Sequence, residues 1–327
     1  RPLENLDELP FPDFKIFGVK ELPYYPILTS RGCPFRCTYC FRSLKGDWRP
    51  RSPANVVKEI EEAINTYRFK HIVIHDDSFN LDLKRVSEIC ELLISRGIRI
   101  PWKCAGIRAN HMTDEVCKGM KAAGCFEVAV GIESLDPEVF EGINKKESLE
   151  SILEGISILR RHKIKVVGYF IIGLPGDNYQ KTMETFKKAN KIVDEQSWTL
   201  LLPIKGTPLW DDLHRSPKVD WLNDYRDIDM TWLPRLSEIK TAFETPEYRA
   251  KEKIRAYHKI NILLGLPKYK IYSSRVQTIL GGIWLILKFA PLRGTLNMIR
   301  LLPRVLKKLK SERISLSVKD LKLTSED

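Results

Sequence analysis

The chain has 327 residues, of which 43% are hydrophobic and 29% are charged. This composition is that of a folded globular protein, and it excludes an intrinsically disordered chain. The formal net charge is +12, but residues 251–310 alone hold fourteen Lys and Arg against the single acidic residue Glu252. Because the last seventeen residues carry a net charge of −1, residues 1–250 are close to neutral and the basic character belongs to the tail.

The seven cysteines are an odd number, and the first thirty residues lack the apolar stretch of a secretory signal. Together these features predict a reducing compartment, in which thiols serve as ligands or core residues and not as a disulfide framework. We therefore expect a cytoplasmic location. The chain opens on Arg1-Pro2 without an initiator Met, which favours further sequence upstream.

Residues 1–26 are rich in proline and aromatic residues and predict an extended linker lying against a domain surface. The next residues, Ile27-Leu28-Thr29-Ser30, predict a short strand that ends at a cysteine-containing loop. Strand and helix patterns then alternate as far as residue 202. Strands are predicted at 71–75, 102–107, 126–132, 164–172 and 197–202, and helices at 52–67, 82–96, 113–123, 148–162 and 178–193.

Strands separated by helices of ten to fifteen residues indicate a parallel sheet with right-handed crossovers. Six such units are too few for a closed eight-stranded barrel, so we predict an α/β fold, a partial (β/α)6 TIM-like barrel over residues 27–210. In parallel barrels the chemistry lies at the carboxyl ends of the strands, where each of the motifs below falls.

Residues 211–327 are predicted to form a C-terminal aromatic and basic amphipathic helical region. The apolar run at 279–291 is too short to span a bilayer. Its basic residues, interleaved with Leu, Ile and Val, favour a helix lying on an anionic membrane surface, here the inner face of the membrane. RNA binding is the main alternative, and nucleic acid is not expected because the tail has few stacking aromatic residues. A second alternative is a tail whose apolar face packs on the barrel.

Cys33, Cys37 and Cys40 form a CxxxCxxC motif on the loop after the first strand. Three thiolates on one short loop can ligate three irons of a 4Fe–4S cubane and leave the fourth iron open to an exogenous ligand. The alternative is a structural zinc site, but such a site needs four protein ligands, and no fourth is evident nearby.

This loop, with Tyr39 just before the third cysteine, resembles the signature of the radical S-adenosylmethionine (SAM) superfamily. The resemblance implies that the open iron binds SAM and passes it an electron from a flavodoxin- or ferredoxin-type donor. It further implies that a 5′-deoxyadenosyl radical then abstracts hydrogen from an unreactive carbon. Tyr39 is expected to lie near the SAM adenine.

Asp76 and Asp77 follow the second predicted strand. From local chemistry alone they could bind a cationic amine or cap the next turn. The resemblance implies contact with the SAM amino group, and the Asp-Asp-x-Phe form is similar to that of the cobalamin-dependent branch of the superfamily.

Glu133 ends the fourth strand, where it is expected to accept hydrogen bonds from ribose hydroxyls. Lys145 lies twelve residues further on, and the resemblance implies that it pairs with the SAM carboxylate; a solvated Lys beside a helix is the alternative. Gly173, in the Gly-Leu-Pro-Gly turn after the fifth strand, is expected to leave a flat surface for adenine. Arg108, at the end of the third strand, is expected to hold a carboxylate or a substrate anion.

The lead-in of residues 1–12 resembles the linker that follows a cobalamin-binding domain in one branch of the superfamily, so cobalamin would be held by a domain upstream. This branch implies methylation or rearrangement of a small molecule, either a lipid or a secondary metabolite. Two alternatives are a tRNA-modifying enzyme of the methylthiotransferase type and a non-enzymatic metal- or Fe–S-binding protein.

Overall fold

The computed structural model describes residues 5–41, 47–224, 228 and 239–264. The chain divides into two compact units, one formed by residues 1–229 and 240–257 and the other by residues 230–239 and 258–327. All that follows concerns the first unit. The predicted basic amphipathic stretch from residue 279 onward lies outside the described residues, and the predicted domain boundaries stay a prediction.

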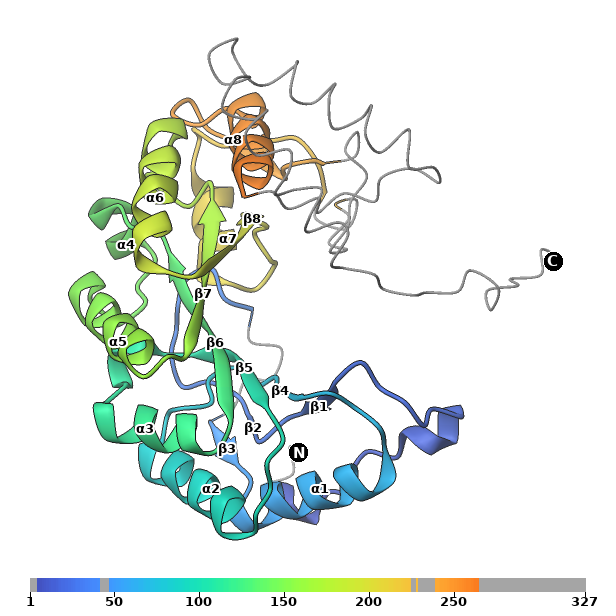
Figure 1. The fold of residues 1–327 in the computed structure, drawn as a ribbon. Coiled ribbons are helices and arrows are strands. Elements are labelled where there is room, and N and C mark those ends of the chain that lie inside the picture. Colours follow the sequence, from blue (N-terminus) through green and yellow to red (C-terminus); the bar gives the residue numbers. More distant parts are fainter. Residues whose placement is uncertain (1–4, 42–46, 225–227, 229–238, 265–327) are drawn as a thin grey trace, which may run out of the picture. The chain divides into compact units, whose positions relative to one another are not determined.

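A single six-stranded parallel sheet forms the centre of the first unit (Figure 1). Its strands in chain order are β1 (Tyr25–Ile27), β4 (Ile72–Ile74), β5 (Trp102–Ile107), β6 (Cys125–Glu133), β7 (Lys165–Ile172) and β8 (Glu195–Leu200). Neighbours in the sheet follow the same order, and each pair is parallel. The predicted partial (β/α)6 barrel is therefore confirmed.

Six helices connect the strands and lie along the outer side of the sheet (Figure 1), and two more follow β8 within the described residues. They are α1 (Pro53–Thr66), α2 (Leu83–Ser95), α3 (Asp114–Ala122), α4 (Pro137–Gly142), α5 (Leu149–Arg161), α6 (Tyr179–Ile192), α7 (Pro208–Arg215) and α8 (Ala250–Leu263). From α1 to α7, each helix begins after a Ser, Thr, Asp or Asn whose side chain accepts a hydrogen bond from the first turn.

Short elements complete the described residues. They are the 3-10 helices η1 (Leu6–Glu8), η2 (Phe14–Phe17) and η3 (Ala109–His111), the antiparallel pair β2 (Ser30–Arg31) and β3 (Arg49–Pro50), and the antiparallel pair β9 (Asp220–Trp221) and β10 (Phe243–Glu244). The helices α4 and α7 were not predicted, because six and eight residues are too few to show a helical period.

The first strand ends earlier than its sequence predicts, at Ile27 and not at Ser30. Thr29 leaves the parallel ladder because its backbone N–H donates to the Asp76 carboxylate at 2.6 Å. Ser30 then turns to pair with Pro50 in the small antiparallel sheet. A side chain from the neighbouring strand thus ends the ladder immediately before the cysteine loop.

The core lies between the sheet and the outer helices. Along β7, buried and half-buried residues alternate, as expected of a strand with one face against helices and the other toward the barrel interior. Phe170 stacks on Trp198 of β8 with ring centroids 4.6 Å apart, and Phe186 of α6 meets the same indole edge-on. These aromatic contacts fix α6, and with it the turn at the carboxyl end of β7.

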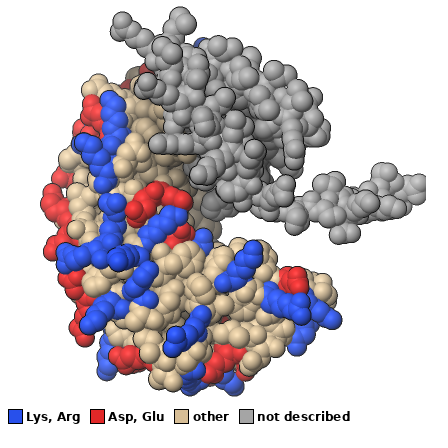
Figure 2. All heavy atoms as spheres, in the orientation of Figure 1, with Lys and Arg blue, Asp and Glu red and all other residues tan. Residues whose placement is uncertain are grey.

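On the face shown in Figure 2, Lys and Arg are interspersed with Asp and Glu over the described surface. This distribution agrees with the near-neutral charge of the first 250 residues. In the described ranges, no helix combines the length and apolar character needed to cross a bilayer.

Gly155 allows α5 to approach η3 closely, since a Cβ atom there would overlap the carbonyl oxygen of Ala109. We predict that Gly155→Ala lowers the free energy of unfolding by about 1–3 kcal/mol, because two backbones must separate to admit one methyl group. Gly119→Ala is the matched control: its Cβ would meet nothing within 4 Å in α3, and we expect about 0.5–1 kcal/mol of stabilisation from higher helix propensity. Urea denaturation measures both. Equal effects of the two substitutions would contradict the close approach.

Candidate functional site

The backbone that leads into the cysteine loop is fastened by one buried carboxylate. Asp76, at the carboxyl end of β4, accepts hydrogen bonds from the Thr29 N–H (2.6 Å), the Thr29 hydroxyl (2.5 Å) and the Ser30 hydroxyl (2.6 Å). Arg85 of α2 donates to the Thr29 carbonyl from the other side at 2.6 Å. Burial raises the pKa of Asp76, although these hydrogen bonds act in the opposite direction. Both backbone polar groups of Thr29 are therefore held.

The three cysteines of the loop differ from the other four in their exposure. Cys33 and Cys37 are half-buried and Cys40 is exposed, whereas the remaining cysteines are buried: Cys90, Cys104, Cys117 and Cys125. The predicted division into ligand and core thiols thus matches the observed accessibility.

Burial is the main influence on the loop thiols. It raises the pKa of Cys37, while the positive charges of Lys145 and Arg108 act against that rise. Burial also raises the pKa of Cys40 to about 11, with smaller contributions from Cys37, Cys33 and other nearby groups. The three thiols are therefore close enough for their charges to interact, and two cationic side chains lie near one of them.

Residues between the cysteines attach the loop to the barrel. The Thr38 N–H donates to the carbonyl of Ile143 at 3.1 Å, and its own carbonyl accepts from the Leu209 N–H at 3.0 Å. The Phe35 ring lies under the guanidinium of Arg108, with the guanidinium carbon 3.5 Å from the ring centroid. A loop with no regular structure of its own is thus positioned from several sides.

The Tyr39 hydroxyl donates to Glu133 at 2.8 Å, and the Lys145 ammonium lies 3.3 Å from the same carboxylate oxygen. Lys145 also donates to the carbonyl of Gly131. Burial and the adjacent Glu133 raise the pKa of Tyr39, so its hydroxyl stays protonated and can act as the donor. Glu133 has a φ of 67°, an uncommon value for a residue other than glycine. Such strain is retained where surrounding contacts determine the conformation.

Arg108 is held by hydrogen bonds at its backbone and at one nitrogen of its guanidinium. Its backbone N–H and carbonyl both bind the Asn80 side chain, at 2.9 and 2.7 Å, and its guanidinium donates to the carbonyls of Lys145 and Lys146. Its Nε lies 3.2 Å from the carboxylate of Glu147, whose side chain is 1% exposed. The other oxygen of Glu147 lies 3.6 Å from the Lys145 ammonium.

The structure thus brings together four of the predicted site residues: Tyr39, Arg108, Glu133 and Lys145. Asp76 is engaged with Thr29 and Ser30, and Asp77 is exposed, close enough to raise the pKa of Cys40. Gly173 has a φ of 90° and lies against the side chain of Lys253. The roles assigned to all of these residues at a SAM site stay predictions.

Sequence reasoning missed three residues of the site: Phe35, Asn80 and Glu147. Phe35 lies between two cysteines but is not itself a ligand type, and Asn80 and Glu147 belong to no motif. Glu147 balances the local charge, since it and Glu133 face the two cations Arg108 and Lys145. The spacing of charges along the chain gives no signal for this arrangement, which forms only when β5, β6 and the segment after α4 meet.

The donor set fits the cluster that the cysteine spacing predicts. Three thiols that are half-buried or exposed lie close together on one loop, and Lys145 and Arg108 partly offset the rise that burial causes in the pKa of Cys37. Within the described residues, no three His, Cys, Asp or Glu side chains converge as the ligands of a single metal ion do. A 4Fe–4S cubane does not require three side chains to converge on one point, because each thiolate binds a separate iron.

Comparison with known proteins gives the same picture. Residues 27–189 match the model of the Radical SAM superfamily. An uncharacterized methyltransferase, PH0819, from Pyrococcus horikoshii is 33% identical over 220 residues, which is 64% of this chain and 48% of the relative. The anaerobic magnesium-protoporphyrin IX monomethyl ester cyclase of Cereibacter sphaeroides is 27% identical over 251 residues, which is 72% of this chain and 40% of the relative. The chain therefore spans less than half the length of these curated relatives.

Among solved structures, the fold is similar to that of TsrM from Kitasatospora setae, a radical SAM methyltransferase with tryptophan and a SAM analogue bound. The TM-score is 0.55 at 19% identity, covering 62% of this chain and 42% of TsrM. A second TsrM structure holds cobalamin and a [4Fe-4S] cluster. At this identity the likeness concerns the fold alone.

Glu147 is expected to stabilise the site by neutralising two buried cations. We predict that Glu147→Gln lowers the free energy of unfolding by about 3 kcal/mol, because removing one partner leaves buried charge uncompensated. Glu150→Gln is the matched control, since it removes the same charge from the exposed first turn of α5 and should change stability by less than about 0.5 kcal/mol. Chemical denaturation compares them, and an equally small loss in both variants would contradict the charge balance.

Proposed function

The chain belongs to the radical SAM superfamily, and on this premise we propose that Cys33, Cys37 and Cys40 hold a 4Fe–4S cluster at which SAM is reductively cleaved. The observation that carries the proposal is the difference in exposure between two groups of cysteines. The three cysteines with the predicted spacing are accessible on one loop, while the other four are buried. The loop is fixed to four separate parts of the barrel, so its thiols are preorganised for a rigid ligand.

When bound, the reduced cluster supplies the electron that divides SAM into methionine and a 5′-deoxyadenosyl radical. The residues of the chain bind and orient. Lys145 and Arg108 supply positive charge for the SAM carboxylate, and Glu133 accepts hydrogen bonds from the ribose. Tyr39 and Gly173 border the adenine, and Asp77 faces the amino group. Thiols kept free for such a site require a reducing compartment such as the cytoplasm, where a flavodoxin- or ferredoxin-type donor supplies electrons.

We further propose that the natural protein is a cobalamin-dependent methyltransferase or cyclase acting on a small molecule, including lipids and secondary metabolites. Support comes from the relatives, which are named as a methyltransferase and a cyclase and are more than twice as long as the matched part of this chain. The TsrM fold, found with cobalamin, adds to this support. No described contact favours the tRNA-modifying alternative.

Cluster formation can be tested by anaerobic reconstitution with iron and sulfide, followed by dithionite and SAM. We predict that the wild-type chain binds about four irons and releases 5′-deoxyadenosine, and that Cys37→Ala loses both, because two thiolates cannot retain the cubane. Cys90→Ala is the control: it removes a buried thiol and should keep both properties. Iron analysis and chromatography of the products provide the readout. A chain that binds one zinc ion and no cluster would overturn the proposal.

The cobalamin proposal can be tested by expressing the gene with its upstream sequence. A chain extended by about 150 residues, one domain's worth, should bind hydroxocobalamin and show its visible spectrum after gel filtration. Residues 1–327 alone should elute without it. If the extended chain, folded by circular dichroism, also elutes without cobalamin, the methyltransferase assignment fails while the cluster proposal stands.

A further inference from the structure

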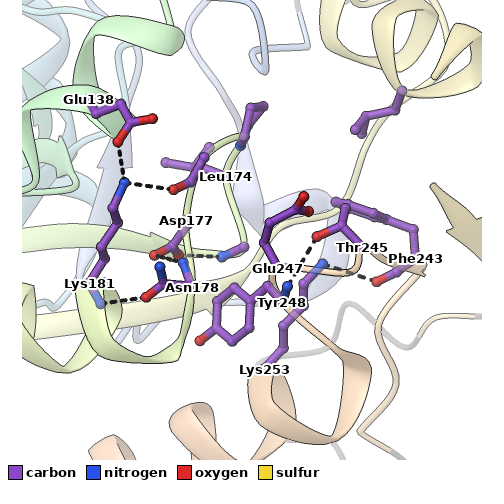
Figure 3. Close-up of a pocket in the computed structure, with 14 residues that line it drawn as sticks. Glu138, Leu174, Asp177, Asn178, Lys181, Phe243, Thr245, Glu247, Tyr248 and Lys253 are labelled. Atoms are coloured by element: carbon purple, nitrogen blue, oxygen red, sulfur yellow. Dashed lines mark hydrogen bonds and ion pairs between the residues drawn. The ribbon is translucent and has the colours of Figure 1, made fainter. Parts of the chain in front are cut away.

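A cavity of about 470 Å³ lies beside the turn that follows β7. Its walls are the turn of residues 173–178, the first turn of α6, Leu213 of α7 and the segment from Phe243 to Lys253 (Figure 3). Within the described residues it shares Gly173 with the predicted SAM site and no other residue of that set. The cavity therefore lies next to the position expected for the adenine, and it does not include the cysteine loop.

Lys253 brings a buried ammonium to this cavity. The residue is 2% exposed, and its Nζ lies 3.6 Å from the centroid of the Phe243 ring and donates to the Phe243 carbonyl at 3.1 Å. Its stem passes over Gly173, where a Cβ atom would come within 3.0 Å of Cε. The absence of a side chain at Gly173 is thus what admits the lysine.

The ammonium lacks a carboxylate partner. In the described part of the chain, no Asp or Glu oxygen lies within ion-pair distance of the Lys253 Nζ. The nearby Asp177 directs its oxygens elsewhere, to the Gly173 N–H at 2.9 Å, the Asn178 N–H at 2.8 Å and the Thr182 hydroxyl at 2.9 and 3.1 Å. An ammonium has three donors, and the described contacts use one of them.

The cavity is also lined by the buried Asp177 and by the more exposed Glu138, Lys181 and Glu247. Glu138 and Lys181 form an ion pair at 2.5 Å, and Glu247 is exposed to solvent. Glu138 is thus paired and Glu247 is hydrated. The charges of Asp177 and Glu244 favour the protonated form of Lys253, but no carboxylate oxygen of the described residues is in ion-pair contact with its ammonium. A buried cation without a partner destabilises the fold unless an anion completes it.

We propose that this cavity is an anion-binding subsite in which Lys253 holds a carboxylate or phosphate group of the small-molecule substrate. The Phe243 ring lies against the ammonium, and Leu174 is a further apolar residue of the cavity wall, so carbon atoms next to that group would meet apolar surface. Assigning the anion to the substrate rests on the proposed function, whereas the anion binding itself does not. Burial lowers the pKa of Lys253 to about 8, which still leaves most of the amine charged at neutral pH.

The test measures binding of inorganic phosphate and, separately, of acetate to the apo chain by calorimetry at pH 7, without cluster or SAM. We expect wild type to bind at least one of them, and Lys253→Met to bind it about 10- to 100-fold more weakly, as for loss of a charged hydrogen bond. Lys251→Met, an exposed position on the same helix, should bind like wild type. Whichever of the two anions binds shows whether the site takes a phosphate or a carboxylate.

The thermal stability of the variant distinguishes a role of Lys253 in anion binding from a role in folding. Without anion, Lys253→Met should melt no lower than wild type, since it keeps the apolar stem and removes an unpaired charge. If the variant fails to fold, Lys253→Gln replaces it in the same calorimetry, since it also removes the charge and keeps a polar group at the end of the stem. Binding of neither anion by wild type, or equal binding by the folded variant, overturns the subsite. None of these results depends on 5′-deoxyadenosine formation.

Discussion

The cysteine loop has no secondary structure of its own, so its position depends on hydrogen bonds supplied by the ends of the strands. Asp76 is the most deeply placed of these supports, because it withdraws Thr29 from the β1 ladder just before the loop begins. Tyr39, Thr38 and Phe35 then attach the loop further along. Parallel pairing makes this arrangement possible, since it gathers the carboxyl ends of all six strands along one edge.

The charged side chains beside the cysteine loop also balance one another. Two cations and two carboxylates meet in a buried cluster beside Cys37, and both cations also donate to backbone carbonyls. Glu133 has a φ of 67°, and contacts such as these can hold a residue in an uncommon backbone conformation.

The fold could be predicted almost completely, because alternating strand and helix patterns of this length admit few topologies. The three cysteines of the loop are more accessible than the other four, and Tyr39, Glu133, Lys145 and Arg108, which the motifs singled out, lie together. The sequence did not predict Glu147, Phe35 or Lys253. Their contacts join segments that are 39 to 80 residues apart in the chain, and local patterns carry no information about such meetings. The premature end of β1 escaped prediction for the same reason.

The contact between Gly173 and Lys253 has a consequence for how this family of sequences can diverge. The lysine stem occupies the volume that any side chain at position 173 would need, so the two positions share one space. A homologue that acquires alanine or serine at the first position must shorten or redirect the residue at the second, and the order of the two changes matters. Correlated substitution between the barrel turn and the C-terminal helix would therefore record a change in ligand charge during evolution.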